Sequence, residues 1–190
     1  MKKITLLATA FALTASAAFA QTWSIDKAHS RVGYTVLHMG ISLSDGNFKT
    51  FDAKINASKD DFSDASVEFT ADVNSINTDN ERRDGHLKSA DFFDAAKYPT
   101  ITFKSKSFKK VSDKKYKVVG DLTFHGVTKP VELDATLNGV ITNPQSKKQM
   151  AGFTITGIIK RADFNFASAM PATALGENVE LVAHTEFSKD

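Results

Sequence analysis

Two groups of polar side chains have the residue types that catalyse hydrolysis. Asp26, His29 and Ser30 lie near the beginning of the chain, and Asp84 and His86 lie in a later segment. An imidazole held by a carboxylate can take the proton of a serine hydroxyl and so turn it into a nucleophile. The sequence has neither a G-x-S-x-G turn nor an H-E-x-x-H helix to position such groups. We predict no catalytic residue, and a hydrolase stays as an alternative.

The later segment could instead bind the polar end of a ligand. Arg82, Arg83 and His86 could donate hydrogen bonds to a phosphate or a carbonyl. The alternative is a structural corner in which an arginine, Asp84 and His86 bond to one another and hold the segment against the rest of the domain. The histidines are not spaced with carboxylates as zinc ligands usually are, so we predict no metal site and no cofactor.

The first twenty residues differ from the rest of the chain. Lys2 and Lys3 precede an uncharged run over residues 4–19, which ends in the small-x-small pattern Ala18-Phe19-Ala20. This is the pattern of a secretory signal peptide cleaved after Ala20. We therefore predict a signal peptide over 1–20, a single domain over 21–190, and a periplasmic or secreted protein.

The composition of residues 21–190 excludes several classes of protein. Without Lys2 and Lys3 the chain has 22 basic and 22 acidic residues, so it has no net charge to attract nucleic acid. It has no cysteine, which rules out disulfides and thiolate metal sites. A domain of this length can be held together by burial of apolar side chains alone.

Alternation of apolar and polar residues with a period of two dominates the chain and predicts about eight strands. The expected strands lie around residues 32–38, 46–55, 67–73, 101–106, 116–124, 131–137, 153–159 and 179–184. Turn signals separate most of them: Ser44-Asp45-Gly46, His125-Gly126, Asn143-Pro144 and Leu175-Gly176. Thr128-Lys129-Pro130 is expected to belong to the turn at His125.

One segment lacks this alternation. Residues 79–95 begin with cap-like polar residues and continue with a helical pattern, which predicts a short helical insertion. Many alternating strands with one such insertion indicate an all-β protein, a single antiparallel barrel or sandwich. Thirteen Phe, three Tyr and one Trp follow residue 20, mostly on the apolar sides of strands. An eight-stranded barrel can hold one small ligand, although these rings could also fill the interior completely.

Ordered motifs run through essentially all of 21–190: Trp23-x-Ile25-Asp26-x-x-His29-Ser30, Tyr34-x-Val36-x-His38, Gly46-x-Phe48, Ser75-Ile76-Asn77-Thr78, Arg83-Asp84-x-His86-Leu87, Asp91-Phe92-Phe93-Asp94, Tyr98-Pro99-x-Ile101-x-Phe103, and Gly120-Asp121-Leu122-Thr123-x-His125-Gly126-Val127-Thr128-Lys129-Pro130-Val131. In these motifs the sequence resembles a known family, the YceI-like, periplasmic polyisoprenoid-binding proteins. The sequence departs from the family pattern at Ser44, Asp45 and Asn165, the last standing where a glycine is common.

The resemblance implies an eight-stranded lipocalin-like barrel that carries a long apolar lipid and has no established catalytic activity. A polyisoprenoid, a prenyl quinone or a fatty-acid-like chain would fit, and a transient contact with a membrane is compatible with such a ligand. The chain could be a monomer or a dimer. The expected ligand-binding residues are the inward apolar side chains Tyr34, Val36, Phe48, Phe69, Val73, Ile76, Phe103, Leu122, Phe124, Phe153 and Ile155.

The first alternative is a periplasmic hydrolase acting on a lipid-like substrate. A small outer-membrane barrel is the second alternative, because it too has a signal peptide and alternating strands. It would need the polar sides of the strands to face a narrow lumen. Those sides carry many charges, such as Glu68, Lys104 and Asp121, and burying them unpaired would cost several kcal/mol each. The charges therefore favour a barrel with an apolar interior and a polar outer face exposed to solvent.

Overall fold

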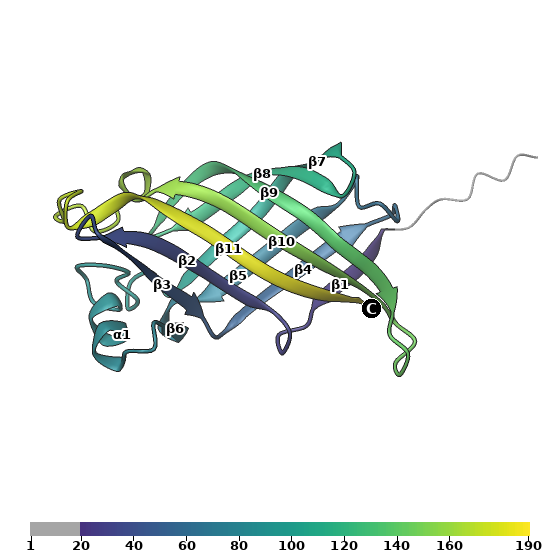
Figure 1. Cartoon of the computed structure of the whole chain (residues 1–190), viewed down its shortest axis with the longest axis horizontal. Coiled ribbons are helices and arrows are strands. Elements are labelled where there is room, and N and C mark those ends of the chain that lie inside the picture. Colours follow the sequence, from purple (N-terminus) through teal and green to yellow (C-terminus); the bar gives the residue numbers. More distant parts are fainter. Residues whose placement is uncertain (1–19) are drawn as a thin grey trace, which may run out of the picture.

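The chain folds into a closed, eight-stranded antiparallel barrel, as the computed structural model of residues 20–190 shows (Figure 1). Except for Ala20, the predicted signal peptide lies outside the described residues. The strands are β1 (Gln21–Ile25), β2 (Arg31–His38), β3 (Ser42–Phe48), β4 (Phe51–Ala57), β5 (Ser66–Asp72), β6 (Ile76–Asn77), β7 (Thr100–Ser112), β8 (Lys115–Phe124), β9 (Val127–Thr142), β10 (Gln149–Lys160) and β11 (Leu175–Lys189). The predicted all-β barrel is thus confirmed.

The barrel closes because β11 is long enough to pair with two strands in succession. The circuit runs β1-β4-β5-β7-β8-β9-β10-β11, and the end of β11 pairs back onto β1 through Trp23 and Lys189. The first half of β11 pairs instead with β2, which continues the wall into β3 and β6. One end of the barrel is therefore built from β2, β3 and β6.

The helical insertion is shorter than its predicted range of 79–95. α1 covers Glu81–Leu87, and the Asn80 side chain accepts a hydrogen bond from the backbone N–H of Arg83 at its start. Two short 3₁₀ turns, η1 (Val73–Ser75) and η2 (Arg161–Phe164), follow β5 and β10. In Figure 1, α1 and the loop between β10 and β11 lie at the end of the barrel that holds the β2–β3 turn, away from the C-terminus. None of the helices in residues 20–190 has the length and apolar character needed to cross a membrane.

The turn prediction at Ser44-Asp45-Gly46 is wrong, because these residues lie inside β3. The chain reverses earlier, at Met39 and Gly40, which both have positive φ. The predictions for Leu175-Gly176 and Thr128-Lys129-Pro130 are also wrong, since these residues belong to β11 and β9. The turns at His125-Gly126 and Asn143-Pro144 are confirmed.

Aromatic rings fill the end of the barrel opposite α1. Phe62 comes from the loop after β4, adopts a positive φ and is almost fully buried. Its ring lies 5.1 Å from Trp23 and 5.2 Å from Phe153. The Tyr116 hydroxyl donates a 2.5 Å hydrogen bond to the carbonyl of Asp61, which holds this loop in place. This end of the barrel is closed by side chains.

The outer face of the sheet is polar, and its charges pair across neighbouring strands. Lys104 lies 3.0 Å from Glu68, Lys106 lies 2.6 Å from Asp121, and Lys117 contacts carboxylates of β9. These pairs are exposed, and each adds little to stability. They do place the charged side of the alternating pattern on the outside of the barrel.

Candidate functional site

An apolar cavity of about 440 Å³ runs inside the barrel. This size falls in the range of small-molecule sites, roughly 300 to 1,000 Å³. Its wall is made by inward side chains of the strands, among them Phe69, Phe103, Leu122 and Leu181. Small residues such as Ala71 and Ala135 on the same faces leave space that larger side chains would fill.

The cavity opens at the end of the barrel that carries α1. The lining residues that are exposed to solvent are His38, Arg83 and His86, which belong to β2 and α1. Met170 and Leu175, in and just after the β10–β11 loop, complete this mouth. A ligand can therefore enter past α1, while Phe62 and its neighbours close the far end.

Nine of the eleven side chains predicted to bind ligand line this cavity: Tyr34, Val36, Phe48, Phe69, Phe103, Leu122, Phe124, Phe153 and Ile155. Val73 and Ile76 do not. They are buried in η1 and β6, where the chain turns away from the wall after β5. Arg83 and His86 line the mouth, whereas Arg82 is exposed and does not.

A compact hydrogen-bond network holds Arg83 at the mouth. Its Nε donates to the Thr78 hydroxyl at 2.8 Å, and its Nη2 donates to the Thr78 carbonyl at 2.6 Å. The Asp84 carboxylate accepts from the backbone N–H and the hydroxyl of the same threonine, at 2.8 and 2.6 Å. The corner differs from the expected one, because Arg83 and Asp84 both bond to Thr78 instead of to each other, and His86 packs on the ring of Phe92 at 4.8 Å. Two of the five N–H donors of Arg83 are used in these bonds.

Tyr34 brings a polar group into the cavity wall beside this network. A Cβ at Gly46 would lie 2.6 Å from the Tyr34 hydroxyl and 3.0 Å from Cγ2 of Thr78. Burial raises the pKa of the Tyr34 phenol, so the ring stays neutral and can donate or accept a hydrogen bond. Its ring packs 6.2 Å from Phe48 and 6.3 Å from Phe93. The mouth therefore combines aromatic surface with a few hydrogen-bonding groups.

A buried arginine that the sequence did not single out supports the other side of the mouth. Arg161 is 3% exposed and donates to the carbonyls of Ala167 and Met170, each at 2.6 Å. Its guanidinium also lies 2.9 Å from the carboxylate of Glu177. A planar group with five donors suits such a cluster of carbonyls. Arg161 thereby fixes the β10–β11 loop, whose Phe166 and Met170 line the cavity.

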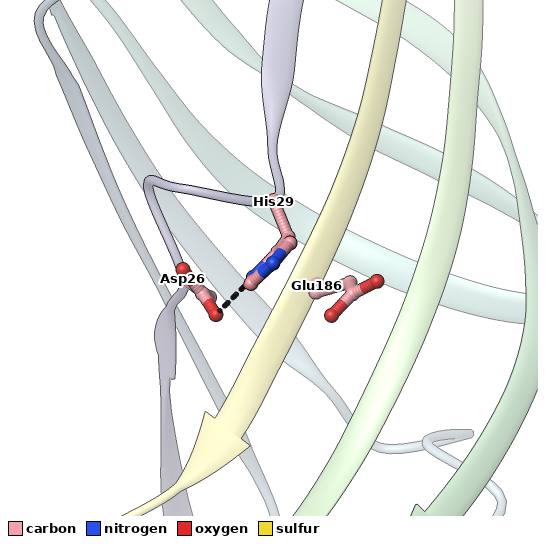
Figure 2. A group of neighbouring side chains, drawn as sticks. All are labelled: Asp26, His29 and Glu186. Atoms are coloured by element: carbon pink, nitrogen blue, oxygen red, sulfur yellow. Dashed lines mark hydrogen bonds and ion pairs between the residues drawn. The ribbon is translucent and has the colours of Figure 1, made fainter.

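The first polar group lies at the corner between β1 and β2, and none of its residues lines the cavity. Figure 2 shows Asp26 and His29 of this group beside Glu186 of β11. His29 Nδ1 is 2.8 Å from Asp26, a contact that raises the pKa of the imidazole and lowers that of the carboxyl. The Ser30 hydroxyl accepts a hydrogen bond from the backbone N–H of Glu186, so it is held by β11 and not by His29. These contacts stabilise the turn between β1 and β2. Ser30 and His29 do not form a nucleophile–base pair.

The same corner has the donor types of a metal site. One ligand atom each from Asp26, His29 and Glu186 lies within 4.8 Å of the others. The hydrogen bond between His29 and Asp26 already gives two of them a structural role.

Comparison with known protein families agrees with this barrel and its motifs. The YceI-like domain matches residues 23–187. The chain belongs to the YceI-like family. A UPF0312 protein of Staphylococcus aureus strain USA300 is 39% identical to this YceI-like chain over 170 residues, covering 87% of this chain and 96% of the relative.

Solved structures share the YceI-like barrel. The YCEI protein of Campylobacter jejuni is 37% identical, with a TM-score of 0.74 over 81% of this chain and 90% of that one. BcnA of Burkholderia cenocepacia has the same fold at 24% identity, with a TM-score of 0.76 over 85% and 98%. A polyisoprenoid binding domain from Saccharophagus degradans shares the fold at 15% identity, with a TM-score of 0.65 over 90% and 99%.

Proposed function

We propose that this protein binds a long apolar lipid inside its barrel and carries or sequesters it. The observation that carries the proposal is the 440 Å³ apolar cavity, closed by aromatic rings at one end and open beside α1 at the other. A polyisoprenoid, a prenyl quinone or a fatty-acid-like chain has the apolar surface that such a wall would cover. The neighbour from Saccharophagus degradans, a polyisoprenoid binding domain, has the same fold.

Burial of apolar surface supplies the binding energy. Each Å² of apolar surface removed from water contributes about 25 cal/mol, so a ligand that loses about 300 Å² gains roughly 7 kcal/mol. Immobilising the ligand offsets part of this gain. The nine inward side chains described above would contact the hydrocarbon, and Arg83 and His86 would contact a polar head group at the mouth.

The two alternatives fit the geometry less well. A hydrolase would need a nucleophile near the ligand. Of the candidate residues His86 lines the cavity mouth, but the candidate nucleophile Ser30 and its neighbours Asp26 and His29 do not line the cavity. An outer-membrane barrel would present an apolar belt to lipid, whereas here the outer face carries paired charges. A periplasmic or secreted location follows from the predicted signal peptide and belongs to the same proposal.

Native mass spectrometry of the purified protein tests this function. The proposal expects a mass above that of the chain alone, which returns to the chain mass after extraction with organic solvent. Identification of the extracted species would name the lipid. A ligand-free mass, together with no uptake of a long isoprenoid alcohol added in detergent, would overturn the proposal.

A further inference from the structure

The β2–β3 turn gathers exposed apolar side chains beside the cavity mouth. Within the described residues eight large apolar side chains are exposed, and four of them fall between positions 37 and 43. Ile41 is 86% exposed, Leu43 68% and Met39 57%, and Leu37 is the fourth. No Lys, Arg, Asp or Glu occurs from Leu37 to Ser44. These four side chains are called the apolar tip below.

The fold itself does not require an apolar tip. Met39 has a positive φ of 53°, a conformation that Asn, Asp and Gly adopt more readily than methionine. Leu37 and Leu43 face each other across β2 and β3. They point away from the cavity, because their neighbours Val36, His38 and Ser44 line it. Leaving such side chains in water costs free energy, so a partner that covers them would bind favourably.

The apolar tip is continuous with the mouth of the cavity. The backbone N–H of Met39 donates a 2.9 Å hydrogen bond to the carbonyl of Ala174, which is itself a lining residue. His38, between Leu37 and Met39, lines the mouth from the same strand. A surface that covers the tip therefore also lies against the entrance through which a ligand must pass.

We propose that the apolar tip inserts into the surface of a lipid bilayer and sets the cavity mouth against it. The inference rests on the proposed function, because a water-insoluble ligand has to move between the barrel and a membrane. Four side chains on one turn form a wedge of the kind that enters the headgroup boundary, where apolar burial drives binding. They are too few for a stable protein interface, which needs about 800 Å² from each partner. Because the tip carries no charged residue, its binding does not depend on anionic lipid.

Flotation with phosphatidylcholine vesicles tests the proposal on the full protein. Wild type should float with the vesicles at both low and high salt, since apolar insertion is not screened. Met39→Asn with Ile41→Ser should lower the bound fraction about tenfold or more, because it removes most of the exposed surface of the tip. Asn suits the positive φ of position 39, so the turn itself is preserved. The matched control is Val140→Ser with Ile141→Ser, which removes two exposed apolar side chains near the end of β9, at the opposite end of β11.

A second measurement does not depend on loss of binding. The chain has no cysteine, so Ile41→Cys can carry a single environment-sensitive fluorophore. The emission maximum of the label on Ile41→Cys should shift to shorter wavelength when vesicles are added. The emission maximum of the same label on Ile141→Cys should not shift. Equal behaviour of the two positions, or of the two serine variants, would overturn the proposal.

Two controls separate the proposal from its rivals. The first control is sedimentation without vesicles. If the wild-type protein is a dimer, the variant Met39→Asn with Ile41→Ser is a monomer, and neither protein binds vesicles, the apolar tip is a self-association surface and the proposal fails. Uptake of an isoprenoid alcohol from detergent should be the same in the tip variant and in wild type. Failure of wild type to take up the alcohol would instead count against the proposed function, whatever the vesicles show.

Discussion

Tyr34 and Gly46 face each other across β2 and β3, and the tyrosine ring occupies the space that a side chain at position 46 would need. A Cβ at Gly46 would lie 2.6 Å from the Tyr34 hydroxyl and 2.7 Å from Cζ of its ring. The glycine is therefore required by close packing inside a strand. Its neighbour across the sheet forms part of the cavity wall.

Gly46→Ala should destabilise the barrel by about 1 to 3 kcal/mol, the usual cost of an extra methyl group in a packed site. The added Cβ also has to push the Tyr34 ring toward the cavity, so lipid binding should weaken as well. Urea denaturation and a binding titration measure the two effects. Gly139→Ala is the control, because nothing lies within 4 Å of a Cβ built there. Equal stability of the two variants would contradict the packing argument.

The cavity wall can be tested at Phe103, which is buried and lies opposite Phe69 on β5. Phe103→Asp places a carboxylate where hydrocarbon has to lie, so it should weaken lipid binding about a hundredfold or more, equivalent to roughly 3 kcal/mol. Phe69→Asp should act in the same way. Binding is measured by titration with an isoprenoid alcohol in detergent.

A matched control stands one residue away. Thr102→Asp puts the same charge on the opposite face of β7, between the uncharged partners Thr70 and Thr123. It should leave binding within about twofold, because the side chain does not line the cavity. Circular dichroism has to show folded barrels for all three variants. A folded Phe103→Asp protein with normal affinity would mean that this side chain does not contact the ligand.

The alternating pattern predicted most of the cavity wall, and the resemblance to the YceI-like proteins favoured a barrel over a sandwich. Alternation with a period of two assigns each side chain to a face, and the apolar face of a closed sheet must point inward. This is why Phe103, Leu122 and Phe153 could be assigned before the fold was known. Alternation says nothing about where a strand begins, so β1 and the two-residue β6 were not predicted.

The incorrect or missing predictions concern residues whose role depends on contacts outside their local sequence. Gly46 has the sequence signature of a turn, but a glycine is needed there because the ring of Tyr34 on the paired strand β2 occupies the space of a side chain. Arg161 was not singled out, because nothing in its local sequence indicates that carbonyls of the following loop surround it. Val73 and Ile76 continue the apolar pattern past the end of β5, where the chain has already left the wall. Local patterns carry no signal for these long-range contacts.

The corner between β1 and β2 gives a pH prediction. The pKa of His29 lies above its ordinary 6.5, first because of the hydrogen bond to Asp26 and then because of the charges of Asp26 and Glu186. Asp26→Asn should lower the pKa of His29 toward 6.5, and Glu186→Gln should lower it less. Titration of the imidazole resonances by NMR measures each value.

The same pair makes stability depend on pH in a definite direction. Because the pKa of His29 is raised in the folded protein, the protonated imidazole stabilises the fold below pH 6.5. This contribution is lost as the pH rises through the pKa that His29 has in the folded protein. The pKa of Asp26 is lowered from 3.8, so its contribution is lost as the pH falls through its own folded value. The wild-type advantage over Asp26→Asn should therefore be greatest between about pH 4 and 6.5. An advantage that stays constant from pH 4 to 9 would show that the pair does not titrate as a unit.

The head group can be tested with two adjacent arginines that the structure distinguishes. Arg83 lines the cavity mouth and Arg82 does not, although both lie in α1. Methionine keeps much of the apolar stem of an arginine and removes its charge. Arg83→Met should weaken binding of an isoprenoid phosphate by about 1.5 to 3 kcal/mol, roughly ten- to a hundredfold, through loss of a charge-assisted hydrogen bond. Arg82→Met should leave it unchanged.

A neutral isoprenoid alcohol of the same chain length separates recognition of the head group from support of the fold. Arg83 also donates to the hydroxyl and the carbonyl of Thr78, so its loss could loosen the segment before α1. If Arg83 binds the phosphate, Arg83→Met weakens binding of the phosphate and spares the alcohol. Equal weakening of both ligands would assign Arg83 to the Thr78 and Asp84 corner alone. No weakening of either would place the head group away from Arg83, and His38 and His86 would then be the remaining exposed polar side chains of the described cavity lining.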